Sequence, residues 1–418
     1  MNNLIMRASL FINYFVFAML LNSVGTVILQ VQNSLGVQAS DAAILEAYKD
    51  ISIALTSFIV ASFLVRVGYR RCMMIALTAM TIVCALVPSV PTFLMTKLLF
   101  LATGVSFALV KISVFGSLGL LAKDQRDHVS TMNFLEAFFM LGVMAGYFVF
   151  SAFVDARQPE SLNWLNVYYL LAGLNAIALV LLLIAKLDEA SLQLDKAPGF
   201  VQEFTSMVQL SIQPLVIVFI VSVFLYVLVE QSIMSWLPSF NSQVLHLSSA
   251  LSIEMASILA ASTALGRLLA GFVLRRMSWY YLLNATLLVA ILLVLVALPL
   301  AAGVSGEVIY TWADAPLAAF VFPLIGLCLA PVYPAINSVV LSALPARQHA
   351  PMAGLIVVFS ALGGTLGSLI TGNIFQVFGG TTAFYSAIVP IGAILVALYL
   401  LRRFVARQTE SVSSAMSQ

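Results

Sequence analysis

The chain has 418 residues, of which 62% are hydrophobic and only 9% are charged, and its formal net charge is +2. Soluble domains are usually about 45–50% apolar and about 25% charged, and a soluble monomer of this length needs a polar surface that this composition does not supply. The composition therefore argues against soluble enzymes, nucleic-acid binders, disordered chains and disulfide scaffolds. It predicts a membrane protein that crosses the bilayer many times.

The hydrophobic residues fall into long runs. A membrane-spanning helix needs about 20 predominantly apolar residues. Twelve such runs follow one another along the chain: 9–31, 44–65, 72–90, 93–121, 132–154, 165–185, 215–237, 251–273, 281–301, 317–341, 352–375 and 384–404. The first run is too long for a signal peptide and no cleavage site follows it, so we expect an uncleaved helix. The sequence thus predicts an all-α membrane protein with twelve transmembrane helices.

The distribution of Lys and Arg between the loops predicts the orientation, because basic residues gather in cytoplasmic loops. If the N-terminus is cytoplasmic, the cytoplasmic segments contain Arg7, Arg66, Arg70, Arg71, Lys123, Arg126, Lys186, Lys196, Arg275, Arg276, Arg347, Arg402, Arg403 and Arg407. The loops on the other side contain only Arg157. We therefore expect both termini in the cytoplasm. We expect the protein in the plasma membrane and, because its loops are short, in the inner membrane of a bacterium.

The chain divides into two halves. A polar segment, 188–214, separates an N-terminal bundle of six spans, 1–187, from a C-terminal bundle, 215–418, that ends in a short cytoplasmic tail. A basic turn follows span 2 and again span 8, at matching positions of the two halves. Repeated halves are common in secondary transporters. The sequence therefore predicts two pseudo-symmetric six-helix bundles.

This layout and the turn after span 2 resemble the major facilitator superfamily. The turn resembles its signature loop, G-x-x-x-D-[RK]-x-G-[RK]-[RK], with Ala61 in place of the Gly and Val65 in place of the Asp. Three segments, 230–238, 266–271 and 326–334, are more similar to the fucose/glucose/galactose permease branch. The resemblance implies transport by alternating access. The residues expected to serve gating or helix structure are Arg66, Gly68, Arg70, Arg267, Gly271, Arg275, Pro331 and Pro334.

Charged residues inside a span need a reason, because each costs about 2.5–3.5 kcal/mol at the bilayer centre on insertion scales. Lys111 lies near the middle of span 4 and Glu136 lies in span 5. Two readings stay open for Lys111: a structural ion pair with Glu136, or a cavity position that attracts an anionic or hydroxyl-rich substrate. Glu46, Lys49 and Asp50 are expected near the outer water boundary.

Glu230 in span 7 is a candidate for the carboxylate that binds a coupling ion. The fucose-type symporters that the chain resembles carry acids in spans 1 and 4, where this chain has Thr26 and Leu109. If transport is coupled to an ion, the resemblance leaves Glu230 or Glu136 as the carboxylate, and uniport stays an alternative. An indole beside polar groups can bind a sugar ring, which draws attention to Trp236 in the same span.

Two further spans carry features of cavity-lining helices. Pro331 and Pro334 break the hydrogen bonding of span 10, and the freed carbonyl groups then need partners other than lipid. Two polar residues, Asn22 and Thr26, lie at mid-depth in span 1. The residues expected to bind substrate are Asn22, Thr26, Lys111, Gln231, Trp236, Tyr333 and Asn337. The closely spaced glycines of span 11 are expected to serve helix packing.

These patterns predict a secondary active transporter that imports a sugar or similar small polar metabolite together with a proton or sodium ion. The alternative is a uniporter or antiporter of a small organic anion attracted by Lys111; a non-transporting membrane sensor is the most remote alternative. No cluster of nucleophile, base or metal ligands indicates an enzyme. We expect no cofactor, no metal and no nucleic-acid partner, and we expect a monomer in the lipid bilayer.

Overall fold

The computed structural model describes residues 2–61, 67–121, 125–185, 187, 189, 200–301, 306–345 and 348–416. The described residues are almost entirely helical, and their only β-type pairing is an isolated bridge between Leu247 and Ile309. Eleven of the helical segments are long and apolar enough to cross a membrane. The helix at the second predicted span, α4 (Ile44–Ala61), is not among them, and it contains three charged residues. The all-helical prediction is confirmed, while the count of twelve spans stays a prediction.

The chain forms two compact units. Unit 1 comprises Met1–Phe200 together with Ser248–Ser257. Its helices, in chain order, are α1 (Asn2–Asn22), α2 (Val24–Leu35), α3 (Ala39–Ala42), α4, α6 (Tyr69–Leu86), η1 (Val87–Ser89), α7 (Phe93–Leu121), α8 (Gln125–Ser151), η2 (Leu162–Asn166) and α9 (Val167–Ile184). The predicted span 93–121 coincides with α7.

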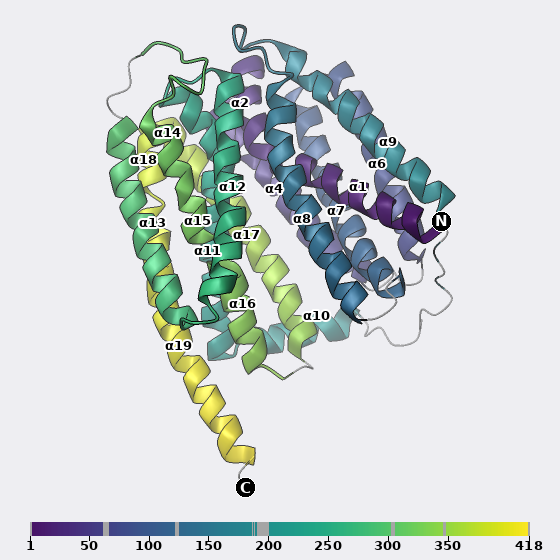
Figure 1. Cartoon of the computed structure of the whole chain (residues 1–418), viewed down its shortest axis with the longest axis vertical. Helices are drawn as coiled ribbons and strands as arrows, with labels where there is room; N and C mark the ends of the chain where they lie inside the picture. The colour runs from purple at the N-terminus through teal and green to yellow at the C-terminus, as the bar shows by residue number, and fades with distance from the viewer. Residues whose placement is uncertain are drawn as a thin grey trace. The chain divides into compact units, whose positions relative to one another are not determined.

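Unit 2 comprises Val201–Leu247 and Ile258–Gln418. Its helices are α10 (Phe200–Ser211), α11 (Pro214–Gln243), α12 (Ser249–Val273, whose first residues group with unit 1), α13 (Trp279–Ala301), α14 (Leu317–Val321), η3 (Phe322–Leu324), α15 (Ile325–Leu329), α16 (Val332–Ala343), α17 (His349–Phe378), α18 (Gly380–Tyr385) and α19 (Ile388–Met416). The yellow helix α19 extends well past the other helices of this unit (Figure 1). The amphipathic helix α10 lies inside the segment expected to be a polar linker.

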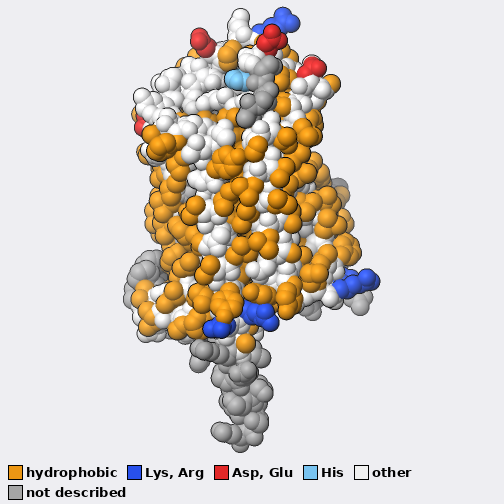
Figure 2. Space-filling model, turned by 90° about the vertical axis from the view of Figure 1, so that its left-hand side faces the viewer, with side chains coloured by type: hydrophobic (Ala, Val, Ile, Leu, Met, Phe, Trp, Pro, Cys, Tyr) orange, Lys and Arg blue, Asp and Glu red, His pale blue; other side chains and the backbone are white. Residues whose placement is uncertain are grey.

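Apolar side chains cover the outside of the helices. In α13, for example, Leu288, Leu292 and Leu295 are about half exposed or more. On the face shown in Figure 2, hydrophobic side chains occupy the middle, basic side chains lie mainly at the lower end, and acidic side chains lie at the upper end. A hydrophobic surface of this kind is stable only in contact with lipid. The three cysteines, Cys72, Cys84 and Cys328, are buried and free.

Two predicted spans are broken helices. Span 1 is interrupted at Ser23, between α1 and α2, where the Ser23 hydroxyl donates a 2.7 Å hydrogen bond to the Leu20 carbonyl. Span 10 is interrupted at Pro331 and also at Pro323, which lies in η3 (Figure 1). Pro334 lies in the first turn of α16, where the backbone N–H groups have no partner within the helix. The sequence predicted breaks at Pro331 and Pro334, whereas the structure breaks span 10 at Pro331 and at Pro323, and Pro334 continues α16.

Glycines allow neighbouring helices to approach closely. A Cβ atom at Gly363 or Gly367 of α17 would lie 2.4 Å from the Phe224 carbonyl oxygen or 2.3 Å from the Leu228 carbonyl oxygen of α11. Hydrogen in place of a side chain is therefore required at both positions. This packing role agrees with the expectation for the glycines of span 11.

Candidate functional site

Three side chains of unit 2 gather around Glu230, which lies close to the middle of α11. The hydroxyl group of Tyr226 donates a 2.7 Å hydrogen bond to Glu230 Oε1, and Arg267 of α12 places a guanidinium nitrogen 3.9 Å from the same oxygen. The ring of Tyr226 stacks on the ring of Tyr333, with centroids 5.6 Å apart. The Glu230 side chain remains 22% exposed. We call Tyr226, Glu230, Arg267 and Tyr333 the Glu230 cluster.

Helix geometry explains why these residues meet. Tyr226 and Glu230 are one turn apart on α11, so their side chains lie on the same face. The break at Pro331 begins α16 immediately before Tyr333. Arg267 was expected to serve gating or helix structure, and the structure places it beside the carboxylate of Glu230.

Unpaired polar atoms lie next to the cluster. Asn337 of α16 and Ser360 of α17 are close to the Tyr333 hydroxyl group. Asn337 Oδ1 and Ser360 Oγ are buried, and neither has a hydrogen-bond partner among the described residues. A buried polar atom without a partner is costly unless water or a ligand satisfies it. This part of unit 2 can therefore accept hydrogen bonds from a hydroxylated molecule.

A small cavity borders Glu230. Its accessible volume is about 10 Å³, and its walls include Met234, Leu259, Thr263 and Gly326. This volume suits about one water molecule. In this conformation the cavity beside the carboxylate is thus too small for a metabolite.

Two other residues of α11, Trp236 and Gln231, were expected to bind substrate. Trp236 is fully buried, its ring packs on Phe375 at 5.3 Å, and its Nε1 donates hydrogen bonds of 3.2 Å to the carbonyl and hydroxyl oxygens of Ser368. The indole is therefore engaged by α17. Gln231 is half-buried.

Unit 1 places Lys111 at the edge of an aromatic cluster, which we define as Tyr14, Phe17, Phe107, Phe115 and Phe139. The Lys111 ammonium lies 5.7 Å from the centroid of the Phe107 ring, and the rings of Tyr14 and Phe139 are 5.2 Å apart. Both Lys111 and Glu136 are exposed. They interact electrostatically, but no ion pair within 4.0 Å joins them in the described part of unit 1.

The polar residues of span 1 lie beside its break. The Asn22 side chain donates a 2.8 Å hydrogen bond to the Ala18 carbonyl oxygen, and Thr26 is buried. Both residues are thus engaged in the local structure of the interrupted helix.

The basic turn after span 2 contacts the end of α9 and the segment that follows it. Arg70 donates hydrogen bonds to the carbonyl oxygens of Leu182 and Leu183 at 3.1 and 2.9 Å, and its backbone N–H donates to Glu189 at 3.1 Å. Gly68 has φ of 95°, a conformation that favours glycine. Arg66 lies outside the described residues.

The corresponding turn of unit 2 makes fewer contacts. Arg275 is exposed and lies 5.8 Å from the ring of Phe272. A Cβ atom at Gly271 would meet no atom within 4 Å. The two turns that look alike in the sequence therefore have different surroundings.

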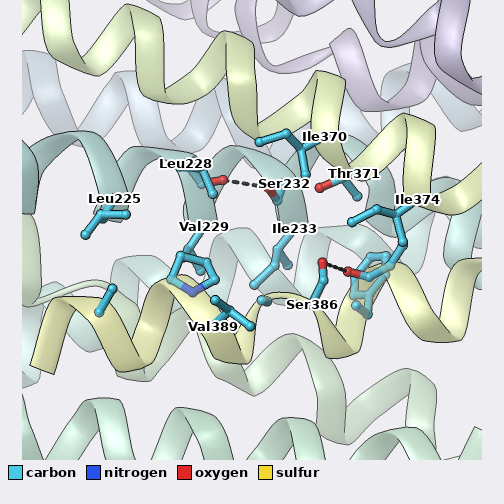
Figure 3. Close-up of a pocket in the computed structure, with 15 residues that line it drawn as sticks. Leu225, Leu228, Val229, Ser232, Ile233, Ile370, Thr371, Ile374, Ser386 and Val389 are labelled. Atoms are coloured by element: carbon cyan, nitrogen blue, oxygen red, sulfur yellow. Dashed lines mark hydrogen bonds between the residues drawn. The ribbon is translucent and has the colours of Figure 1, made fainter.

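A second cavity of unit 2 is apolar. It has a volume of about 380 Å³ and lies between α11, α17 and the segment of α18 and α19 (Figure 3). Ser232 and Ser386, which face it, already donate hydrogen bonds to the carbonyl oxygens of Leu228 and Ala383. No charged residue lines it. A hydroxyl-rich ligand would find almost no free partner there.

Sequence reasoning missed Tyr226, Ser360 and the aromatic cluster. Tyr226 could have been found from its spacing of one turn before Glu230. The burial of Glu46, Lys49 and Asp50, with exposures of 0%, 5% and 8%, was also missed, while their expected place near the outer water boundary stays a prediction.

The comparisons with known proteins concern nearly the whole chain. The family described as Major Facilitator Superfamily matches residues 10–368. A bacterial homologue of the human lysosomal transporter Spinster has a similar structure, with TM-score 0.73 and 12% identity over 97% of this chain and 96% of that chain. The nucleoside transporter NupG (TM-score 0.68, 18% identity, 96% and 99% coverage) and the E. coli fucose:proton symporter FucP (0.60, 13%, 96% and 99%) are also similar.

No curated protein sequence matches the chain at a significant level. The structural likenesses, at such low identity, concern the fold. The family match covers most of the chain and agrees with a multi-pass, all-helical membrane protein. The chain therefore belongs to the Major Facilitator Superfamily of membrane transporters.

Proposed function

We propose that the chain is a secondary active transporter that imports a sugar or a similar small, hydroxyl-rich metabolite together with a coupling ion. One bundle would rock against the other by alternating access. The observation that carries the proposal is the pair of buried, unpartnered atoms, Asn337 Oδ1 and Ser360 Oγ, close to the Tyr333 hydroxyl group of the Glu230 cluster.

The chemistry of the cluster suits a sugar. Sugar hydroxyl groups can donate to a carboxylate and to amide and hydroxyl oxygens, while their C–H faces pack against aromatic rings. The cluster offers one partly exposed carboxylate, Glu230, and two stacked tyrosines. The similar fold of a fucose:proton symporter agrees with this substrate class.

A small organic anion is the second candidate. Lys111 is exposed, pairs with no carboxylate within 4.0 Å in the described residues, and lies beside the aromatic cluster of unit 1. An ammonium group next to aromatic rings favours an anion with an apolar body.

The test uses purified protein in liposomes. Uptake of a panel of radiolabelled sugars is measured under an imposed proton or sodium gradient, for the wild type, for Glu230→Gln and for Glu160→Gln, which changes an exposed loop acid. We expect gradient-driven uptake of at least one sugar that is lost in Glu230→Gln and kept in Glu160→Gln. Uptake of labelled carboxylates alone, lost in Lys111→Gln, would favour the second candidate.

We also propose a monomer in a bacterial inner membrane with both termini in the cytoplasm. The support for the orientation is the excess of Lys and Arg on one side of the predicted spans. Labelling of single cysteines, introduced at Arg157 and at Arg402, with a reagent that cannot cross the membrane tests the orientation. Only the cysteine at position 157 should react in intact cells whose outer membrane has been permeabilised.

A further inference from the structure

Three charged side chains are buried near the N-terminal end of α4. Glu46, Lys49 and Asp50, which we call the α4 triad, have exposures of 0%, 5% and 8%. Lys49 donates a hydrogen bond to Glu46, and its ammonium nitrogen lies 3.4 Å from Asp50 Oδ1. Residues just before the triad, Ala42 and Ala43, are fully buried as well. This end of the helix is therefore covered by protein.

The charges of the α4 triad do not balance. Two carboxylates face one ammonium group, so the triad has a net charge of −1 when all three groups are ionised. The α4 helix lies within the second predicted span. An uncompensated charge away from water has a high free-energy cost. Uptake of one positive charge removes this imbalance.

The helices packed against α4 do not supply that charge. α2 has no titratable residue, and α3 has only Asp41, which is exposed and negative. α7 has two cations, Lys97 and Lys111. Lys97 directs its ammonium to the ring of Phe93, 4.3 Å away, and Lys111 directs its ammonium to Phe107. Neither lysine of α7 therefore directs its ammonium at the triad.

A proton fits the triad better than a metal ion does. Lys49 already places an ammonium group between the two carboxylates and would repel a second cation. Among the described residues, no group of three or more acidic, His or Cys side chains could hold a metal ion. Asp50 is the acceptor, because Lys49 contacts Glu46 more closely and the Asp50 side chain keeps an exposure of 11%.

The triad is mechanically connected to α7. The Lys49 carbonyl oxygen lies against Gly104, where a Cβ atom would come within 2.4 Å of it. Lys111 lies two turns further along the same helix. Because the backbone contact leaves no free space, a shift of Lys49 on protonation of Asp50 displaces α7 as well.

We propose that Asp50 of the α4 triad binds the proton that the transporter couples to its substrate. The coupling of this proton to a substrate rests on the proposed function. The binding of the proton rests on the charge and burial of the triad alone. Protonated Asp50 leaves a neutral Glu46–Lys49 pair, which is stable when this end of α4 is closed. Ionised Asp50 restores the net charge of −1 and favours a conformation in which water reaches the triad. Proton binding therefore shifts the equilibrium from this hydrated conformation to the closed one.

The direct test is infrared spectroscopy of the purified full chain in lipid bilayers, titrated from acid to alkaline conditions. In the wild type we expect a carboxylic-acid C=O band that persists at neutral pH and disappears on titration. Asp50→Asn should lose this band, and the control Asp41→Asn should keep it. Asp50→Glu should keep the band at a shifted frequency, which decides the origin of the band if Asp50→Asn does not fold.

A wild type without such a band, a band unchanged in Asp50→Asn, or a band that does not shift in Asp50→Glu would overturn the assignment. The second arm measures transport in liposomes of any sugar that the panel identifies. In Asp50→Asn we expect the accumulation driven by a proton gradient to fall to simple equilibration, while exchange without a gradient continues. If no sugar is transported, the proposed function fails, but the infrared arm still decides whether Asp50 binds a proton.

Discussion

The hydroxyl group of Tyr226 donates a 2.7 Å hydrogen bond to the carboxylate of Glu230, one turn further along α11. Tyr226 is almost fully buried and also stacks on Tyr333. One tyrosine therefore links the acid at the middle of α11 to the helix that starts at the Pro331 break. The side chain of Glu230 is held in place by this link before any ligand binds.

The first prediction concerns this hydrogen bond. Tyr226→Phe should lower the free energy of unfolding by about 1.5–3 kcal/mol, because hydrogen bonds to charged groups contribute about that much. The matched control is Tyr168→Phe, since the Tyr168 hydroxyl is buried without a hydrogen-bond partner in the described residues. Thermal unfolding in detergent measures both variants. Equal effects of the two substitutions would show that the bond to Glu230 contributes nothing.

The second prediction concerns the contact between α11 and α17. Gly363→Ala and Gly367→Ala should each destabilise unit 2 by about 1–3 kcal/mol, as overpacking does, because each new methyl group would meet a carbonyl oxygen of α11. Gly392→Ala is the control, since nothing lies within 4 Å of its Cβ position in α19. Thermal unfolding again provides the measurement. A stability of Gly367→Ala equal to that of Gly392→Ala would contradict the observed packing.

The spans were predictable because their signal is local. Residues 93–121 are predominantly apolar, and the structure forms α7 over the same residues. The break at Pro331 was predictable for the same reason, since a proline removes a backbone donor wherever it lies. Pro323 was missed although the same rule applies, and the amphipathic α10 was missed because it lies in a segment that reads as polar.

The composition of the candidate site was less predictable. Glu230, Tyr333 and Asn337 were found as polar or aromatic residues in apolar spans, but Arg267 was assigned elsewhere. Its approach to Glu230 depends on how α12 packs on α11, which no local pattern encodes. For the same reason, the sequence could not show that the side chain of Glu46 is fully buried.

The third prediction separates the structural role of Trp236 from the expected role in binding. Trp236→Phe should destabilise the protein by about 1–3 kcal/mol, because it removes the indole donor and leaves the buried Ser368 carbonyl oxygen without this partner. The half-saturation concentration for a transported sugar should stay unchanged. Ser368→Ala, which keeps the carbonyl acceptor, should cost less. A large rise in the half-saturation concentration at unchanged stability would show instead that Trp236 contributes to substrate binding.

The last prediction concerns Glu189, which lies over the turn at Gly68. Its Oε1 accepts the Arg70 backbone N–H at 3.1 Å, and a Cβ atom at Gly68 would come within 2.6 Å of its Oε2. The signature loop of the superfamily has an acid where this chain has Val65, so Glu189 brings a carboxylate to the turn from a different part of the chain. Glu189→Ala should therefore speed hydrogen exchange at the Arg70 amide by about tenfold, equivalent to about 1.4 kcal/mol.

A double-mutant cycle isolates this contact. Gly68→Ala should destabilise the protein through backbone strain and through displacement of Glu189, whereas in the Glu189→Ala background only the strain remains. Gly379→Ala is the control for strain alone, because Gly379 also has positive φ, 82°, and no atom within 4 Å of its Cβ position. We expect Gly68→Ala to cost more than Gly379→Ala by about 1 kcal/mol, and this excess to vanish without Glu189. An excess that persists in the Glu189→Ala background would mean that Glu189 does not pack on the turn.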